Sequence, residues 1–369
     1  MPPHPYRPAF AQVRRVRRRP GSRRSDVAEE TSERGDLPKS LLAAHRAVHL
    51  ALTGRPALLL SRSNLLRQLV RDTLQGLTVP SAPVEAATVH GWVMRHLGYG
   101  APRTQDGWFD WTALTGQAAG TLGTYDGTMP HLVVDEGQDL SPGFYRLVRI
   151  AAVSVTVFAD ECQRLTETNS TLNEITDALG RSTGRVEIAG NHRNSREIAS
   201  LAEHFRIGGT RPEIPFRSGM LPVVRHYSDT KDLADDIAGL AARHPRDRIG
   251  VIVNTMRLAA DLMRLLERAG LAHEPQLYSS EASSGRYRDL DLARPGVVLV
   301  HRASTKGLDF DTVVIADTES DSATDPTAAT LRMAYYVVIT RARQRPVLGW
   351  QGSRLPRHLE GLDGLADSR

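Results

Sequence analysis

Cysteine and long hydrophobic runs are nearly absent from this 369-residue chain, and each absence argues against one class of protein, those with disulfides and those that span a membrane. Cys162 is the only cysteine, so no disulfide can form within the chain, and we expect a reducing, cytoplasmic location. No apolar run approaches the roughly 18–20 residues that cross a bilayer, so no membrane partner is expected. The best candidate, 150–159, is interrupted by Ser154 and Thr156 and suits a buried strand instead.

Lysine is also scarce, because 44 of the 47 basic residues are arginines and only Lys39, Lys231 and Lys306 are lysines. This bias fits a GC-rich coding sequence, so the arginine excess is not in itself a sign of binding. The net charge of +5 and the pI near 9.5 permit a nucleic-acid partner without requiring one. Because most basic residues in this chain are arginines, each lysine indicates a functional position more strongly than an arginine does.

Length and patterning predict two α/β domains. Residues 1–38 hold nine arginines and almost no apolar periodicity, so we expect a basic, disordered N-terminal segment. From there on, buried-strand patterns alternate with helical patterns, which predicts two tandem lobes, each a parallel sheet flanked by helices. The expected lobes are 39–183 and 184–350, the second opening with a strand at 186–189, and 351–369 reads as a poorly ordered tail. A site between the lobes is the default expectation.

The most informative stretch is 131–139, where a short apolar strand ends in two adjacent carboxylates. Ligands of open α/β sheets collect at the carboxyl ends of the strands. Asp135 is therefore placed to hold Mg²⁺, directly or through water, and Glu136 to orient or deprotonate a water that attacks a phosphate. The alternative is a solvated acidic turn after a core strand.

Two further polar segments follow strands or begin a helix. Asp160 ends the strand before 161–165, and Gln163 has an amide that can donate to a phosphate while accepting from water. Asn194 or Ser195 can cap a helix, and Arg193 just before the cap could point at a phosphate. The alternatives are a polar loop and a plain helix cap.

The last two segments lie near the C-terminus. Thr305, Lys306 and Gly307 follow a buried strand and form a plausible anion-binding turn, with Asp309 just before the next strand. Arg341 follows an apolar helical stretch, where a cation could equally complement the carboxyl end of a helix.

In this order, the segments resemble the motifs of UvrD/Rep-like superfamily 1 helicases. Residues 133–139 look like the Walker B segment Asp-Glu-x-Gln-Asp and 159–165 like motif III, while 191–195 resemble Asn-Tyr-Arg-Ser. Residues 306–310 match Lys-Gly-Leu-Glu-Phe of motif V, and 336–343 match motif VI. Upstream, 57–66 and 88–92 look like the motifs Ia and Ib that contact a single strand.

The resemblance implies two RecA-like lobes with ATP and Mg²⁺ between them, and DNA, single-stranded or partly duplex, across their tops. RNA and a protein partner are also compatible with it. The residues it assigns are, for catalysis, Glu136, Gln163, Arg193 and Arg341; for the nucleotide, Lys39, Ser40, Asp135, Asp160, Lys306, Gly307 and Asp309; for the metal, Asp135 and Ser40; and for nucleic acid, Ser61, Asn64, Thr88, His90 and Thr305.

Glycines are missing where the phosphate-binding loop should be. A P-loop reads Gly-x-x-x-x-Gly-Lys-Ser, because glycines let backbone N–H groups wrap the phosphates. Lys39-Ser40 could end such a loop, but Glu33 and Pro38 occupy the glycine positions, and Pro38 has no N–H to donate. We hypothesise either a truncated or frame-shifted start, or a genuine basic tail on a divergent protein.

An aromatic residue is missing after Gln163, where the family stacks a base. Tryptophans 92, 108 and 111 and Phe109 could substitute, although packing in the core is the expected role. The short spacing between motifs leaves no room for large inserted subdomains. Two functions follow: a DNA-stimulated ATPase of the helicase family, or an impaired helicase-like module that binds nucleic acid or a partner without turnover.

Overall fold

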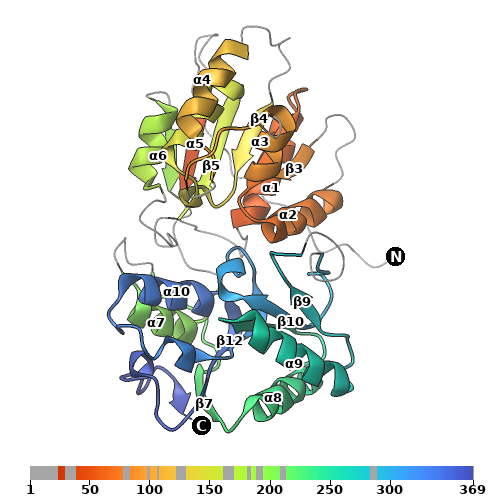
Figure 1. Ribbon diagram of the computed structural model, residues 1–369, viewed down its shortest axis with the longest axis vertical. Helices are drawn as coiled ribbons and strands as arrows, with labels where there is room; N and C mark the ends of the chain where they lie inside the picture. The colour runs from red at the N-terminus through yellow and green to blue at the C-terminus, as the bar shows by residue number, and fades with distance from the viewer. Residues whose placement is uncertain are drawn as a thin grey trace.

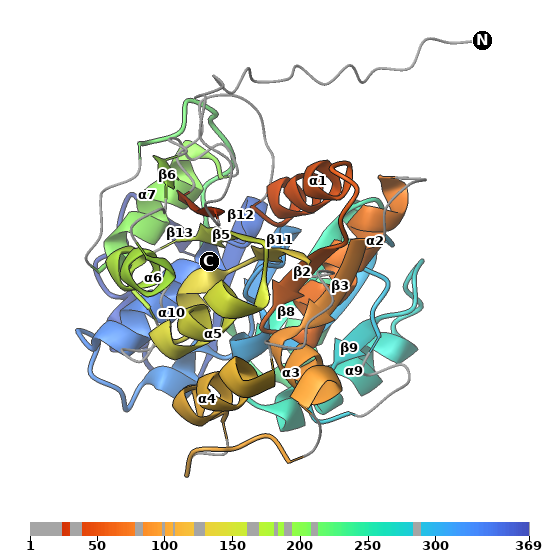
Figure 2. The ribbon, with the colours of Figure 1, turned by 90° about the horizontal axis from the view of Figure 1, so that it is seen from above.

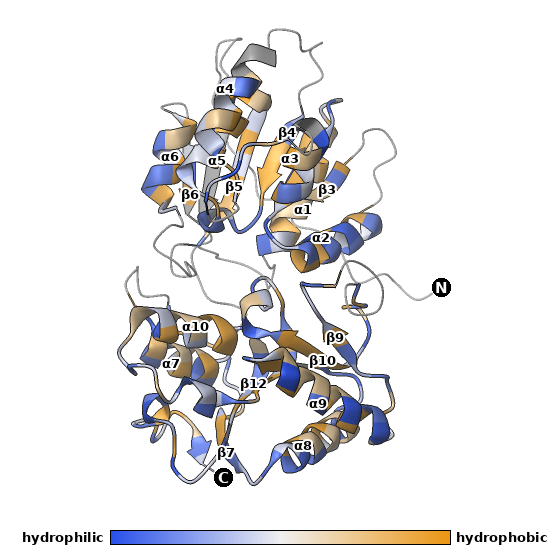
Figure 3. Ribbon diagram, in the orientation of Figure 1, coloured by the Kyte–Doolittle hydropathy of each residue, from blue (hydrophilic) through white to orange (hydrophobic). Residues whose placement is uncertain are grey.

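The computed structural model comprises two α/β lobes stacked along the long axis of the molecule (Figure 1). It describes residues 24–29, 39–77, 84–97, 100–105, 108–121, 130–160, 170–180, 184–187, 194–207, 213–282 and 289–368. Within these ranges no helix is both long and apolar enough to cross a membrane. The apolar residues gather on the strands and on the inner sides of the helices, as the colouring by hydropathy shows (Figure 3).

The first lobe is built on a six-stranded, fully parallel sheet in the order β3-β2-β4-β5-β1-β6. Its strands are β1 (Arg24–Glu29), β2 (Ala57–Ser61), β3 (Val84–Thr88), β4 (His131–Val134), β5 (Ser154–Ala159) and β6 (Gly184–Glu187). Its helices are α1 (Lys39–Ala51), α2 (Asn64–Gly76), α3 (Val89–Leu97), α4 (Trp111–Thr121), α5 (Pro142–Ala151) and α6 (Leu172–Leu179). Helices α1 and α2 cover one face of the sheet, and α3 to α6 cover the other (Figure 2).

Strands β1 and β6 correct the expected organisation. Strand β1 lies within the segment expected to be disordered, yet it pairs with β5 along its full length and with β6 on its other side. Strand β6, expected to open the second lobe, therefore belongs to the first. Only Val27 and Ala28 in β1 are apolar, so the hydrophobic pattern of this segment is too weak to predict a strand. The strand forms because the segment pairs with β5 and β6.

The second lobe holds a seven-stranded parallel sheet in the order β13-β7-β12-β11-β8-β10-β9. Its strands are β7 (Val223–Tyr227), β8 (Arg248–Val253), β9 (Gln276–Tyr278), β10 (Gly296–His301), β11 (Phe310–Ile315), β12 (Ala342–Gln351) and β13 (Asp367–Ser368). Its helices are α7 (Arg196–Phe205) and α10 (Ala329–Ile339) on one face, and α8 (Thr230–Arg243) and α9 (Met256–Arg268) on the other.

The C-terminal residues pack onto the second lobe rather than forming the expected poorly ordered tail. His358, Leu359 and Leu362 are buried, and β13 pairs with β7 at the edge of the sheet. The Nε2 atom of His358 lies 2.8 Å from the hydroxyl of Tyr335 on α10. The tail is therefore part of the lobe's core.

Helix α2 belongs to the first lobe by sequence but also packs into the second. Leu65 is part of the hydrophobic cluster of the second lobe. The buried amide of Gln68 donates to Asp289 Oδ1 at 3.0 Å, and its oxygen accepts from the backbone N–H of Leu290 at 3.2 Å. The two lobes are thus joined by packing and by paired hydrogen bonds.

Candidate functional site

Two buried carboxylates follow strand β4 at the interface of the lobes. Asp135 is fully buried and Glu136 is 3% exposed. Glu136 has a φ of 54°, and among the described residues it is the only non-glycine with a positive φ. A left-handed conformation costs about 1–2 kcal/mol for such a residue, and strain of this kind gathers at functional sites. The backbone thus turns sharply where these acids are presented.

Asp135 has the features of a ligand for a hard cation. Its Oδ1 accepts the backbone N–H of Glu136 at 3.0 Å, whereas its buried Oδ2 has no hydrogen-bond partner. Burial first, and the neighbouring Glu136 second, raise the pKa of Asp135, while the side chain of Ser40 opposes this shift. A carboxylate oxygen and a hydroxyl are ligands that suit Mg²⁺, so Asp135 and Ser40 fit a magnesium ion.

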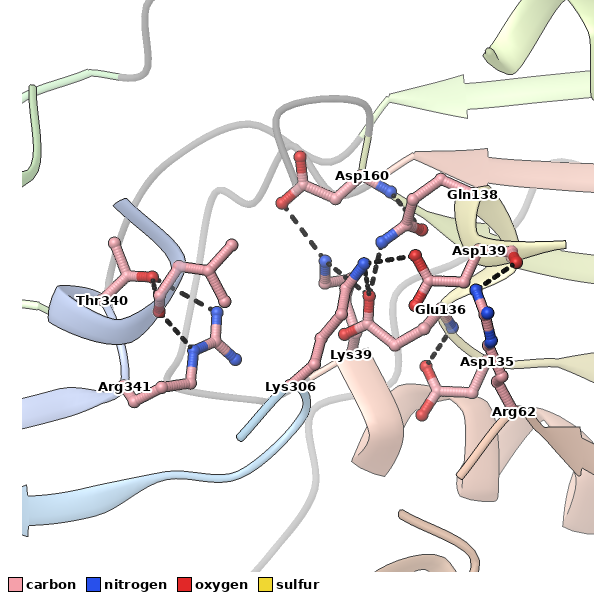
Figure 4. A network of polar contacts seen from close by, with 12 residues as sticks. Lys39, Arg62, Asp135, Glu136, Gln138, Asp139, Asp160, Lys306, Thr340 and Arg341 are labelled. Atoms are coloured by element: carbon pink, nitrogen blue, oxygen red, sulfur yellow. Dashed lines mark hydrogen bonds and ion pairs between the residues drawn. The ribbon is translucent and has the colours of Figure 1, made fainter. Parts of the chain in front are cut away.

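Lys39, at the first position of α1, points into the same cluster (Figure 4). Its Nζ lies 3.2 Å from Asp160 Oδ2, at the end of β5, and 3.9 Å from Glu136 Oε2. The side chain is only 3% exposed. Lys39 and Ser40 therefore face the carboxylates as the end of a phosphate-binding loop would. Residues 30–38, which include Glu33 and Pro38, lie outside the described residues.

The second lobe contributes Lys306 to the cluster. Its Nζ lies 2.5 Å from Asp139 Oδ1 and 3.9 Å from Glu136 Oε2. Asp139 ends the short 3-10 turn Gly137–Asp139 that follows the two acids. Burial raises the pKa of Asp139, and Lys306 opposes this shift. The ion pair joins the lobes directly at the candidate site.

Glu136 is surrounded by cations from both lobes. Burial raises its pKa, but the charges of Lys39, Lys306 and Arg341 outweigh burial, so the net effect lowers the pKa. The carboxylate therefore stays ionised at neutral pH. Lys39 of the first lobe and two cations of the second lobe thus stabilise the charge of Glu136. This set of three cations exists only where the two lobes lie together.

Arg341 is nearly completely buried, with 1% of its surface exposed. Its Nε donates to the carbonyl of Val337 at 2.9 Å, and its Nη2 donates to Thr340 Oγ1 at 3.3 Å (Figure 4). The amide of Asn194 donates to the carbonyls of Thr340 at 3.1 Å and Ala342 at 2.8 Å. Asn194 thereby holds the backbone on both sides of Arg341.

Three further residues complete the cluster; Gln138 and Asp139 have no role predicted from the sequence, and Asn194 has a different one. Gln138, fully buried, donates to Glu136 Oε2 at 2.6 Å and accepts the backbone N–H of Asp160 at 3.0 Å. Asp139 binds Lys306, and Asn194, expected as a possible helix cap, instead positions Arg341; Ser195 accepts the capping N–H of α7. Gln138 and Asp139 could have been found from the sequence, because both belong to the Asp-Glu-x-Gln-Asp pattern.

The residues expected to contact nucleic acid are spread over several environments. Ser61 and Thr305 are buried, and their hydroxyls donate to backbone carbonyls. Asn64 Oδ1 accepts from two nitrogens of Arg67, and Thr88 Oγ1 accepts the backbone N–H of Gly91. His90 is exposed on α3. Of the five, His90 is therefore the one whose side chain is exposed.

Of the remaining residues expected at the site, the structure places Asp309 and Gly307 but does not describe Gln163 and Arg193. Asp309 lies 3.6 Å from Arg343, at the start of β11. Gly307 has a φ of 78°, and a Cβ there would lie 2.7 Å from Leu66 Cδ1 of α2. Gln163 and Arg193 lie outside the described residues. The two residues expected to sense phosphate from the neighbouring loops are thus not placed.

Comparisons with known proteins identify the fold. Neither a protein-family model nor a curated protein matches the sequence. S. cerevisiae Dbp5 bound to RNA and ADP BeF3 is similar in structure, with a TM-score of 0.53 and 14% identity over 94% of this chain and 84% of that one.

Two structures of lower similarity carry the word helicase in their names. An arterivirus nonstructural protein 10 (helicase) has a TM-score of 0.42 at 13% identity, covering 93% of this chain and 62% of that one. The C-terminal domain of a possible DNA helicase from Lactobacillus plantarum has a TM-score of 0.36 at 20% identity, covering 48% of this chain and 99% of that domain. The two parallel-sheet lobes with flanking helices are those of the RecA-like fold, which this chain shares with the Dbp5 structure.

Proposed function

We propose that this chain is an ATP-hydrolysing motor core of the UvrD/Rep-like superfamily 1 type, which translocates on or unwinds DNA. The observation that carries the proposal is the environment of Glu136, a buried, ionised carboxylate between Lys39 of one lobe and Lys306 and Arg341 of the other. A carboxylate held in this way can orient an attacking water, while cations around it stabilise the charge that develops on a transferred phosphate.

In this proposal both lobes contribute residues to the nucleotide site. Asp135 and Ser40 would hold Mg²⁺, which neutralises phosphate charge when bound. Lys39, now paired with Asp160, would contact the terminal phosphates, and Lys306 and Arg341 would approach from the second lobe. Asn194 fixes the backbone around Arg341, so the arginine is positioned before any ligand arrives. Because Lys306 already lies at Asp139 and Glu136, residues of both lobes face the same site.

A second function is favoured by one sequence observation. Glu33 and Pro38 stand where a phosphate-binding loop has glycines, so the chain could bind nucleic acid or a partner without turnover. The buried Lys39 and Ser40 support the first proposal, because both side chains face the carboxylates in spite of these substitutions.

A single assay separates the two functions. ATP hydrolysis is measured with and without single-stranded DNA, beside Glu136→Gln and a matched surface control, Glu360→Gln. We expect wild type and Glu360→Gln to turn over ATP and to be stimulated by DNA, and Glu136→Gln to lose at least 100-fold, about 3 kcal/mol of transition-state stabilisation. Wild-type turnover no higher than that of Glu136→Gln would end the motor proposal.

Because the similar Dbp5 structure is bound to RNA, the nucleic acid is also varied. DNA and RNA oligonucleotides of one sequence are compared at one salt concentration, since the affinity for phosphates depends on salt. Stimulation by RNA alone would keep the motor proposal and replace its substrate.

A further inference from the structure

A buried carboxylate, Asp321, binds side chains from two parts of the second lobe. It ends the short 3-10 turn Thr318–Asp321, which follows β11, and is 7% exposed. Arg302 donates to it twice, from Nη1 to Oδ2 at 2.6 Å and from Nη2 to Oδ1 at 3.1 Å. The hydroxyl of Tyr335, on α10, donates to Oδ2 at 3.0 Å. We call Arg302, Asp321 and Tyr335 the second-lobe triad.

The turn that carries Asp321 is fixed to the neighbouring strand β12. The hydroxyl of Thr318 donates to the carbonyl of Gly349 at 2.9 Å. The backbone N–H of Gln351 donates to Glu319 Oε2 at 3.0 Å. Asp321 is therefore held by the sheet, and the two side chains that bind it are held in turn.

Arg302 begins the loop that carries Lys306. The carbonyl of Arg302 accepts the hydroxyl of Thr305 at 2.8 Å and the backbone N–H of Thr305 at 3.3 Å. Thr305 is 1% exposed and directly precedes Lys306, whose ammonium pairs with Asp139 at the candidate site. The guanidinium of Arg302 thus ties the start of this loop to Asp321.

Tyr335 lies on the helix that leads to Arg341. Two residues further along α10, the carbonyl of Val337 accepts from Arg341 Nε at 2.9 Å. The ring of Tyr335 is 1% exposed and stacks on Phe205 of α7, with the ring centroids 5.2 Å apart. Burial raises the pKa of Tyr335, so the hydroxyl keeps the hydrogen that it donates. A shift of α10 against Asp321 would move the carbonyl that holds Arg341.

The C-terminal segment holds Tyr335 from another side. Burial lowers the pKa of His358, so this ring is neutral at neutral pH. Because the hydroxyl of Tyr335 donates to Asp321, the Nε2 atom of His358 carries the hydrogen of their 2.8 Å bond. The C-terminal segment is therefore part of the network that supports the triad.

We propose that Arg302, Asp321 and Tyr335 are positioning residues of the nucleotide site, which fix the loop carrying Lys306 and the helix leading to Arg341 relative to each other. The inference rests on the proposed function and names what aligns its two second-lobe cations. Both cations have to stabilise the charge on one transferred phosphate, and a misplacement of about 1 Å can lower a rate about 100-fold. A carboxylate shared by both supports makes the two positions depend on each other.

The second lobe also contains a matched control for this triad. The hydroxyl of Tyr227, on β7, donates to Asp236 Oδ2 at 2.9 Å, and Arg225 Nη1 donates to Asp236 Oδ1 at 2.9 Å. Tyr227 is fully buried, but it packs with α8 and α9, on the face of the sheet opposite α10. Tyr227→Phe therefore removes the same chemical group from the same kind of hydrogen bond without touching the supports of Lys306 or Arg341.

The first experiment measures hydrogen exchange without nucleotide in wild type, Tyr335→Phe, Arg302→Lys and Tyr227→Phe. The reporters are the backbone amides of Thr340, which closes the end of α10, and of Thr305, in the loop. We expect Tyr335→Phe to speed exchange at the end of α10 and Arg302→Lys to speed it in the loop, each by about 2- to 10-fold, the effect of one hydrogen bond. Rates in these segments no faster than those of Tyr227→Phe would overturn the positioning role.

The second experiment measures kcat and KM for ATP in the same variants. Tyr335→Phe should lower kcat about 2- to 10-fold and change KM less, because Lys39 and Ser40 of the first lobe still meet the phosphates. Tyr227→Phe should keep the kcat of wild type. A merely structural role for Tyr335 predicts the same kcat in the two tyrosine variants, and that result would contradict the inference.

Arg302→Lys separates geometry from charge. Lysine keeps the positive charge but lacks the planar fork that makes two hydrogen bonds with Asp321, so we expect kcat to fall. A kcat equal to that of wild type would show that only the charge of Arg302 matters and would overturn its positioning role.

The outcomes distinguish this inference from the proposed function. If wild type hydrolyses ATP and Glu136→Gln does not, but Tyr335→Phe and Arg302→Lys behave as Tyr227→Phe does, the inference falls and the proposed function stands. Wild-type turnover no higher than that of Glu136→Gln overturns both. Urea denaturation of the two tyrosine variants establishes that both are folded and that their losses of stability are alike.

Discussion

At the scale of the residue, the most telling feature is how Arg341 is fixed before any ligand is present. Its carbonyl accepts the backbone N–H of Phe310 at 2.9 Å, and Asn194 holds the carbonyls on either side. A long flexible side chain whose backbone is immobilised loses less entropy when it meets a charged ligand. In the proposed function, Asn194, which is only 2% exposed, would therefore act as a positioning residue for Arg341.

Asn194→Ala should therefore affect both stability and turnover. Two buried carbonyls lose their donor, which we expect to cost roughly 2–4 kcal/mol of unfolding free energy. Turnover should fall more than the affinity for ATP, because Arg341 loses its position while the first-lobe residues are unchanged. Urea denaturation and steady-state kinetics measure these effects. If Asn194 acts through Arg341, adding Asn194→Ala to Arg341→Ala lowers turnover no further; an additional loss would contradict this.

Asp317, after strand β11, makes a separate prediction about pH. Burial raises its pKa to about 7, although its two oxygens accept the backbone N–H of Asn254 at 3.1 and 3.0 Å. Between its ordinary pKa near 4 and this raised value, the folded chain holds a proton that the unfolded chain has released. The contribution of Asp317 to the free energy of unfolding therefore falls as the pH rises from about 4 to about 7 and is constant above that.

Asp317→Asn removes this dependence. Relative to wild type, the variant should gain thermal stability at pH 8 compared with pH 5, and Asp261→Asn, at a partly exposed position on α9, serves as the control. Melting temperatures across this range measure the difference. Parallel curves for wild type and Asp317→Asn would show that the carboxyl does not carry the predicted proton.

At the scale of the element, α2 and the loop before β11 form a tight contact between the lobes. Gly307 has the left-handed φ of 78°, and an added Cβ would meet Leu66 Cδ1 at 2.7 Å. Gly307→Ala should therefore cost about 1–2 kcal/mol for the backbone conformation and a further amount for the clash.

The double variant Leu66→Ala/Gly307→Ala separates these two causes. It should remove the clash but not the backbone strain, so the two substitutions are less harmful together than their separate costs suggest. Urea denaturation of the single and double variants gives the coupling. Strictly additive costs would show that Leu66 is not what Gly307 accommodates.

Most elements and the acid–lysine cluster could be predicted from the sequence, because their signals are local. Strands such as β8 and β10 are short apolar runs, and Asp135, Glu136 and Lys306 stand at the ends of such runs. Strand β1 and the C-terminal β13 could not be predicted, because polar segments become strands only through pairing with distant partners. The role of Asn194 likewise depends on carbonyls nearly 150 positions away.

At the scale of the whole molecule, the site exists only where both lobes meet, so nucleotide binding should stabilise them together. A ligand at about 100 times its Kd adds about 2.7 kcal/mol to the unfolding free energy. ATP with Mg²⁺ should therefore raise the melting temperature of wild type, and Lys39→Met should abolish the shift. A rise in the melting temperature without measurable ATP hydrolysis would favour the non-hydrolysing function. No rise in the melting temperature at millimolar nucleotide would contradict a nucleotide site.

Strand β1 has a consequence for how the chain is made. Arg24 pairs with Ser154 and Asp26 with Gly184, so the strand leaves the ribosome long before either of its neighbours. Contacts between such distant segments close slowly, and strand edges that wait unpaired are prone to aggregate. The first lobe thus cannot close its sheet until β6 has been synthesised, and β1, the strand that precedes α1 and Lys39, has both of its neighbours only from then on.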